Sequence, residues 1–423
     1  MDSWKRRLLA PPRWFSLTLA VAGALAIGYA TLLPAPEQAD RVADLPVACI
    51  VCGDLGGTDV SLNLLLFAPF AAGLALMGVR TRRVLVVAAL MSLTIETLQF
   101  AYLPGRDASL SDLLTNTTGA TVVAWLVHRR ALLLFPDRAQ AMRLTTAALA
   151  AWIGLECIAG WSLAPSLPET VYWGQWAPDL GHLEQFKGTV LGAVVGGDSM
   201  PPHRLTETPR FRQRLLQDGG PVAARAVTGH PPASLAPIVS IFDGHSTEIL
   251  LLGQQRDQVV FRMRTHVSDL RMRPPAVRID HALPIVSGES LALEASYLRG
   301  QYRLLVTAGG RAIGDTVDAS PNWAWSYFMP FENYSLGRNA PWLTMLWIGG
   351  LLLPIGYWEG RGLDRGLLLG VWALVGATLA VAPRVCGLPP VHLLEWVAAV
   401  VGLAAGHWLG ERSERTSLAR AGA

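Results

Sequence analysis

The sequence predicts a membrane α-helical protein of about eight transmembrane helices, with an all-β sandwich domain inserted between two of them. The 423-residue chain is 51% hydrophobic and 16% charged, with a mean hydropathy of +0.34, which is too apolar for an ordinary soluble protein. Its apolar residues gather into blocks that match the length of about 20 helical residues needed to cross hydrocarbon. One long interval instead carries short runs that alternate with a period of two.

The apolar blocks define the predicted spans. They cover residues 15–33, 61–79, 84–103, 112–127, 144–164, 342–357, 367–382 and 391–409. The fourth block is at the lower limit of length for a span and carries Thr and Asn, so its assignment rests on topology as well as on length.

These spans divide the chain into five parts. We expect a four-helix membrane domain, a fifth transmembrane helix, a β-sandwich, three C-terminal transmembrane helices and a short tail. Their residues are 1–143, 144–164, 165–341, 342–410 and 411–423.

The basic residues predict the orientation, because Lys and Arg concentrate in cytoplasmic loops. With a cytoplasmic N-terminus, the short outside loops carry only Arg41, Arg106 and Arg384, and the other basic residues beside the spans fall inside. No small-residue cleavage site precedes Pro34, so the first span is expected to remain as an anchor. We therefore expect a multi-pass protein of the plasma membrane (the bacterial inner membrane), with both termini cytoplasmic and the β-domain extracytoplasmic.

The interval 165–341 reads as a series of short strands. In residues 258–266, Val259, Phe261 and Met263 fall on one face and Arg262 and Arg264 on the other. Similar runs occupy residues 186–195, 238–242, 248–253, 291–297 and 301–307. Gly, Pro, Asp and Ser punctuate them, which is typical of an antiparallel sandwich.

The first four spans carry polar side chains that we expect to form one ligand-binding pocket. Pairs three or four residues apart share a helix face, and ionisable groups in hydrocarbon normally face a partner or a cavity. With the predicted orientation, all of them lie in the outer half of the membrane or at its outer edge. The residues are Asp59, Asn63, Glu96, Gln99, Arg106, Asp112 and Asn116.

Arg106 stands in the short turn between the third and fourth spans. It is the natural counter-ion for Glu96, Asp59 or Asp112, and a guanidinium also binds phosphate in a bidentate manner. An enzyme built here would use Glu96 or Asp112 as general base and Arg106 as anion stabiliser. No nucleophile is evident, so binding ranks above catalysis and no catalytic residue is assigned.

These polar residues also carry a family resemblance. The pattern Asp59-x-x-x-Asn63-x-x-x-Phe67-x-Pro69-x-x-x-Gly73, then Glu96-x-x-Gln99, Arg106 and Asp112-x-x-x-Asn116-x-x-Gly119, resembles the VanZ family of small membrane proteins over roughly residues 31–130. The resemblance implies a four-helix membrane domain. Some relatives are linked to low-level resistance to the glycopeptide antibiotic teicoplanin, and the family lends no firmly assigned reaction. The large insert and the four extra helices depart from its minimal members.

The predicted sandwich is similar to laminin-G and concanavalin A-like modules. The likeness rests on the strand pattern of residues 238–242, 247–253 and 258–262. It implies glycan binding, sometimes through calcium, whereas a non-binding spacer is the alternative. The insert has no compact Asp and Asn cluster of the kind that calcium needs, so no metal is predicted.

Two cysteines and two C-terminal residues complete the candidates. Cys49 and Cys52 form a C-x-x-C pair in the first outside loop, where a local disulfide is favoured over a redox or metal role. Glu395-x-x-x-Ala399-x-x-Gly402 repeats the spacing of the fourth span. A transporter would need charged or broken helices near the midplane in both halves, and the second half offers only Glu395 and His392.

Two classes of function follow. In the first, the pocket and the lectin-like domain bind a lipid-linked cell-wall or glycan component at the outer leaflet, with membrane lipids as further partners. In the second, the protein is a non-catalytic scaffold whose polar side chains only hold the helices together. Neither class requires a cofactor or a nucleic acid.

Overall fold

The computed structural model describes residues 11–33, 55–103, 109–180, 183–217, 221–245, 247–283, 287–329, 340–361 and 364–419. Within these ranges, seven helical segments are long and apolar enough to cross a membrane. They cover Arg13–Leu32, Gly56–Leu76, Thr81–Tyr102, Arg138–Ser162, Ala340–Glu359, Gly366–Val385 and Leu393–Arg415. The protein is therefore a multi-pass membrane protein with a β-rich region in the middle of its sequence, as the sequence predicts. The sides on which its termini lie stay a prediction.

The fourth predicted span is also a helix, but it differs from the other seven. It forms α7 (Leu110–His128), which is not among the segments apolar enough to cross by composition. Its buried face is polar and small, with Ser111, Asn116 and Gly119 among its buried residues. It packs against α4 (Gly56–Leu66), α5 (Ala68–Leu76) and α6 (Thr81–Tyr102), and this enclosure compensates for its low hydropathy.

The first helix shows a burial pattern typical of a lipid-facing helix. In α2 (Arg13–Leu32), Leu25 is 70% exposed and Leu17 is 54% exposed, whereas Ser16 and Ala20 are buried. A soluble helix buries its large apolar residues and exposes its small polar ones. The reversed pattern fits a helix whose large side chains meet lipid and whose small residues meet another helix.

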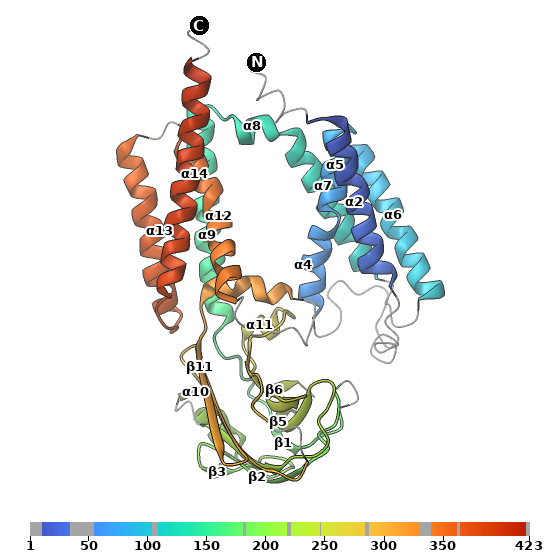
Figure 1. Cartoon of the computed structure of the whole chain (residues 1–423), viewed down its shortest axis with the longest axis vertical. Coiled ribbons are helices and arrows are strands. Elements are labelled where there is room, and N and C mark those ends of the chain that lie inside the picture. Colours follow the sequence, from blue (N-terminus) through green and yellow to red (C-terminus); the bar gives the residue numbers. More distant parts are fainter. Residues whose placement is uncertain are drawn as a thin grey trace. The chain divides into compact units, whose positions relative to one another are not determined.

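Glycines allow these helices to approach closely. A Cβ atom added at Gly23 of α2 would lie 2.5 Å from the Phe70 nitrogen of α5, and one at Gly73 would lie 2.7 Å from the Ser16 carbonyl oxygen. The two helices pack together along this seam, and they appear side by side in Figure 1. One compact unit holds the helices from α2 through α8 (Arg130–Leu134).

The second span is broken. α4 ends at Leu66 and α5 begins at Ala68, with the buried Phe67 between them. Pro69 lies in the first turn of α5, where its missing N–H is tolerated, and the same ring prevents the helix from continuing through without interruption.

Two antiparallel sheets form the inserted domain, which belongs to the other compact unit together with most of the C-terminal helices. The five-stranded sheet has the order β1-β5-β6-β7-β8 and the six-stranded sheet the order β11-β10-β9-β4-β2-β3 (Figure 1). The strands are β1 (Tyr172–Trp176), β2 (Thr189–Val195), β3 (Asp198–Ser199), β4 (Val222–Val227), β5 (Ala236–Asp243), β6 (Glu248–Gln255), β7 (Gln258–Met263), β8 (Ala276–Ile279), β9 (Ser290–Leu298), β10 (Gln301–Ala308) and β11 (Arg311–Asp318).

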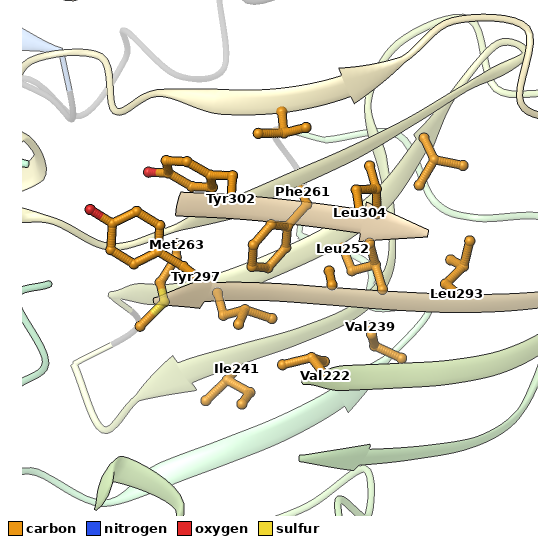
Figure 2. Packing of buried hydrophobic residues seen from close by; sticks show 14 of the residues in the cluster. Val222, Val239, Ile241, Leu252, Phe261, Met263, Leu293, Tyr297, Tyr302 and Leu304 are labelled. Atoms are coloured by element: carbon orange, nitrogen blue, oxygen red, sulfur yellow. The ribbon is translucent and has the colours of Figure 1, made fainter. Parts of the chain in front are cut away.

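The two sheets enclose a single hydrophobic core, as Figure 2 shows. Ile241 of β5 and Leu293 of β9 are buried in the same cluster. Across the core, the rings of Phe261 and Tyr302 meet edge to face with centroids 6.2 Å apart. All six predicted runs contain a strand, and these strands are β2, β5, β6, β7, β9 and β10. Burial alternates along β2, β9 and β10, whereas β5 and β6 are buried on both faces.

Other elements of this region were not predicted. They include the amphipathic helix α10 (Thr208–Gln217), the short helix α11 (His266–Asp269) and the 3-10 helix η2 (Pro321–Phe328) that follows the last strand. The remaining helices are α9 (Arg138–Ser162), α12 (Ala340–Glu359), α13 (Arg365–Val385) and α14 (Leu393–Ala419). A Cβ atom at Gly402 of α14 would lie 2.7 Å from the Gly349 carbonyl oxygen of α12, so these helices also pack through small residues.

Candidate functional site

The buried carboxylate of the N-terminal unit holds the start of a neighbouring helix. Glu96 lies on α6 and is 8% exposed, and its Oε2 accepts a hydrogen bond of 2.7 Å from the Ser109 backbone N–H. Ser109 is the N-cap of α7, and its Oγ accepts from the Ser111 N–H at 3.1 Å. In a capping box, a Glu of the same helix reaches back to the N-cap N–H. Here the Glu comes from the adjacent helix and fixes α6 to α7.

Two buried amides continue this arrangement along the same helices. Gln99 of α6 donates from Nε2 to the Thr31 carbonyl oxygen of α2 at 3.0 Å. Asn116 of α7 donates from Nδ2 to the Ser92 Oγ of α6 at 3.1 Å. Together with the bond to Glu96, these hydrogen bonds connect α6 to α2 and α7. We call the residues that form them the N-terminal polar cluster, which consists of Thr31, Ser92, Glu96, Gln99, Ser109 and Asn116.

The cluster has acceptors that lack donors. Gln99 Oε1 and Asn116 Oδ1 are buried and have no hydrogen-bond partner among the described residues. An unsatisfied buried polar atom costs about 1–3 kcal/mol. Each amide is oriented by the bond that its NH2 donates, and its oxygen is buried without a donor among the described residues.

Three more of the predicted residues lie on α4 and α7, and they differ in exposure. Asp59 is exposed, whereas Asn63 and Asp112 are half-buried. α4 and α7 pack against each other, and a Cβ atom at Gly119 would lie 2.1 Å from the Leu64 carbonyl oxygen. The glycine of the predicted motif therefore has a structural reason, because only a residue without a side chain lets α7 lie against the α4 backbone.

The prediction named three further residues, Arg106, Cys49 and Cys52, which lie outside the described residues. The expected counter-ion role and the expected local disulfide stay predictions. Within the described part of the chain, Cys157 and Cys386 are free cysteines.

Sequence reasoning missed Thr31, Ser92 and Ser109. Hydroxyl residues are common at helix contacts in membranes, so their presence in a span carries little signal by itself. The spacing does carry some signal. Ser92, Glu96 and Gln99 follow one another at intervals of four and three on α6, and all three are buried.

The sandwich carries a separate polar pocket of about 280 Å³. Its charged residues pair with one another: Arg210 Nη2 lies 2.8 Å from Asp198 Oδ1, and Arg210 Nη1 lies 3.2 Å from Glu207 Oε2. His203, Arg204 and Thr206 complete its polar lining. No group of three or more His, Cys, Asp or Glu side chains in the described ranges is placed to hold a metal ion.

Comparison with known proteins identifies the N-terminal helices. No curated protein matches the chain, and no solved structure does. The likeness of the sandwich to laminin-G and concanavalin A-like modules therefore stays a prediction from strand pattern. A family model described as VanZ/LLP1 matches residues 21–134, which run from α2 through α8 and contain the whole of the N-terminal polar cluster. The N-terminal helices of this protein thus form a VanZ-like membrane domain.

Proposed function

We propose that the VanZ-like domain binds a lipid-linked cell-wall or glycan component, and that the N-terminal polar cluster recognises its hydroxyl-bearing headgroup. The observation that supports this proposal is the pair of buried amide oxygens, Gln99 Oε1 and Asn116 Oδ1, which have no donor in the part of the chain that the structure describes. Two such acceptors on adjacent helices complement a ligand rich in hydroxyl groups, and a sugar headgroup is the lipid chemistry that supplies them.

The surroundings of the cluster support a lipid as the molecule that carries this headgroup. Large apolar side chains on the same helices are exposed, among them Leu25 of α2 and Phe100 of α6, which is 78% exposed. Such a surface is solvated by acyl chains in a membrane. One lipid molecule would then place its headgroup in the cluster and its acyl chain along these helices.

The same proposal assigns binding of the sugar to the sandwich. Its polar pocket presents His203, Arg204 and Thr206, whose side chains can hydrogen-bond the hydroxyl groups of a glycan. The VanZ resemblance links some relatives to low-level teicoplanin resistance. We therefore expect variants of the proposed site to change teicoplanin sensitivity in an expressing strain.

The test uses variants of similar volume that remove one amide each. Gln99→Met and Asn116→Leu delete the buried amide oxygen together with the NH2 group that bonds a neighbouring helix. Thr97→Val is the matched control, because Thr97 lies on α6, is exposed, and its Oγ1 bonds only within its own helix, to Leu93 O at 2.7 Å. Each full-length protein is placed in phosphatidylglycerol nanodiscs with increasing glucosyl diacylglycerol, and bound lipid is counted by native mass spectrometry.

We expect glycolipid retention by the parent and by Thr97→Val, and at least a fivefold loss in the two acceptor variants, which corresponds to about 1 kcal/mol per hydrogen bond. Equal retention by all four proteins contradicts the proposal. Preference for phosphatidylglycerol over the glycolipid in the parent contradicts it as well.

The scaffold function is the second candidate, and the Glu96 carboxylate favours it. Its 2.7 Å bond to the Ser109 N–H is a contact between helices that requires no ligand. A purely structural cluster predicts that Glu96→Ala, Gln99→Met and Asn116→Leu all lower folded yield in detergent and that teicoplanin sensitivity follows yield. The binding proposal predicts that Gln99→Met and Asn116→Leu lower glycolipid retention per folded molecule, beyond any loss of folded yield from their interhelical bonds.

A further inference from the structure

The second compact unit holds a buried acidic pair that the VanZ-like domain does not include. Glu156 lies on α9 and is 1% exposed, and Glu395 lies in the first turn of α14 and is 3% exposed. One short 3-10 helix, η2 (Pro321–Phe328), contacts both helices: its Tyr327 hydroxyl lies 3.1 Å from Ser162 Oγ of α9, and its Asn322 bonds Glu395 at 2.7 Å. Both helices are candidate membrane spans, where an isolated charge is costly. A site with two such groups needs a compensating cation.

Neutral donors hold one member of the pair. Glu395 Oε2 accepts from Ser320 Oγ and from Asn322 Nδ2, each at 2.7 Å. Ser320 is the N-cap of η2, and Asn322 lies in its first turn. These two bonds connect α14 to the segment that leaves the last strand of the sandwich, and they favour an ionised carboxylate at Glu395.

The other side of the cluster contains acceptors only. Glu156 Oε2 has no hydrogen-bond partner among the described residues, and neither has Asn322 Oδ1, whose side chain is fully buried. Asn322 faces the pair, because its Nδ2 is bonded to Glu395. Buried acceptors without donors are rare in folded proteins, and each one needs a hydrogen from a ligand or a proton.

The charged and titratable neighbours do not supply the cation. Besides interacting with each other, the two carboxylates interact electrostatically with Tyr327 of η2 and with His392, which precedes α14. Tyr327 is buried, and its hydroxyl lies 3.1 Å from Ser162 Oγ. His392 is exposed at the edge of the cluster. No ion pair of Glu156 or Glu395 is found in the described ranges.

We propose that Glu156 and Glu395 form a proton-binding site, in which Glu156 carries the proton at neutral pH and Glu395 is the ionised partner. A proton is the one cation that needs no cavity and only one acceptor, whereas a sodium or calcium ion needs several oxygens around it. Protonation removes the charge of Glu156 and gives the acceptor-rich side a donor. The pair titrates as a unit, because each ionisation raises the cost of the other.

The site also links the proton to the sandwich. A second proton on Glu395 removes the charged acceptor of Ser320 and Asn322, and charge-assisted bonds are about twice as strong as neutral ones. Acidification is therefore expected to loosen η2 from α14. The proton-binding site acts as a pH-dependent clamp on the segment that leaves the sandwich.

Infrared difference spectroscopy on the purified full-length protein tests the proposal. The parent at neutral pH is expected to show the C=O stretch of a protonated carboxylic acid, with a deuterium shift, and to lose this band in alkaline solution. Glu156→Gln removes an intensity equal to a single carboxyl. Glu411→Gln is the control, because the Glu411 carboxylate pairs with Arg415 at 2.7 Å and should be ionised.

Hydrogen exchange in residues 321–328 provides the second readout. Glu156→Gln imitates the protonated side chain and should leave exchange in η2 unchanged, whereas Glu395→Gln should accelerate it. The titration of the parent band remains informative if a variant does not fold. No protonated carboxyl in the parent, or an undiminished band in Glu156→Gln, overturns the proposal. A melting temperature that rises with sodium chloride but not with choline chloride, and that does not change with pH, also overturns the proposal. Such a result would indicate a sodium site.

Discussion

The core of the sandwich contains two neighbouring tyrosines whose substitution by phenylalanine should have opposite effects. Tyr297 of β9 and Tyr302 of β10 are both buried, with ring centroids 4.4 Å apart. Tyr297 donates from its hydroxyl to the Leu163 carbonyl oxygen at 2.6 Å, whereas the Tyr302 hydroxyl has no partner among the described residues. Burial raises the pKa of both hydroxyls, so both stay neutral wherever the fold is studied.

The magnitudes follow from the hydrogen bonds. Tyr297→Phe removes one bond and leaves the buried Leu163 carbonyl short of a donor, which costs about 1–3 kcal/mol. Tyr302→Phe removes a hydroxyl that was desolvated without compensation, so it should be neutral or stabilising by up to about 1 kcal/mol. For a domain of this size, each kcal/mol moves the melting temperature by about 2–4 °C.

The assay is thermal unfolding of the full-length protein in detergent, followed by the β-sheet signal in circular dichroism. We expect Tyr297→Phe to lower the transition by about 2–12 °C and Tyr302→Phe to leave it unchanged or raise it slightly. Equal destabilisation by the two substitutions would refute the reasoning, because it would mean that the Tyr302 hydroxyl contributes as much as a hydroxyl with a partner.

Two further predictions concern the packing of α7 and the acid stability of the sandwich. Gly119→Ala places a Cβ 2.1 Å from a backbone oxygen of α4 and should destabilise the helix pair by about 1–3 kcal/mol. Gly154→Ala is the control, because its Cβ meets nothing within 4 Å and should cause no such loss. Melting curves in detergent compare the two variants. Burial alone would raise the pKa of Asp269, but hydrogen bonds from Ser166 and neighbouring side chains and the Arg264 guanidinium at 2.6 Å lower it below 3.8. The stability from Asp269 is therefore present above about pH 3.8 and is lost as the pH falls through the lowered value, so the difference between the parent and Asp269→Asn should shrink in acid unfolding experiments. A difference that is constant with pH would contradict the assignment.

Within the six-stranded sheet, β9 and β10 were the most predictable strands, because they bury only one face. In β10, Tyr302, Leu304 and Val306 are buried and alternate with residues that face away, so the period of two is visible in the sequence. β11 lies at the edge of its sheet and has little burial, so its residues show no such alternation. The sequence gives little signal for α10, because this helix is short, has few apolar residues and carries several charges.

The polar residues were predictable in kind but not in their partners. The interval of three between Glu96 and Gln99 placed both on one face of α6, and both are buried. Their partners, Ser109 and Thr31, come from other helices, and helix packing rather than local spacing decides such contacts. Glu156 was overlooked although a lone carboxylate within a span is a signal by itself.

The pairing of the inserted strands also constrains the order of events during synthesis. β1 pairs with β5, and β4 pairs with β9 some seventy residues later, so neither sheet can close when its first strands emerge. At about 5–20 residues per second, the ribosome needs roughly 7–30 s to travel from Tyr172 to Asp318. Neighbouring strands such as β5 and β6 can pair within that time, but β1 waits for β5 and β4 waits for β9. The folding of the insert is therefore expected to respond to the pace of translation.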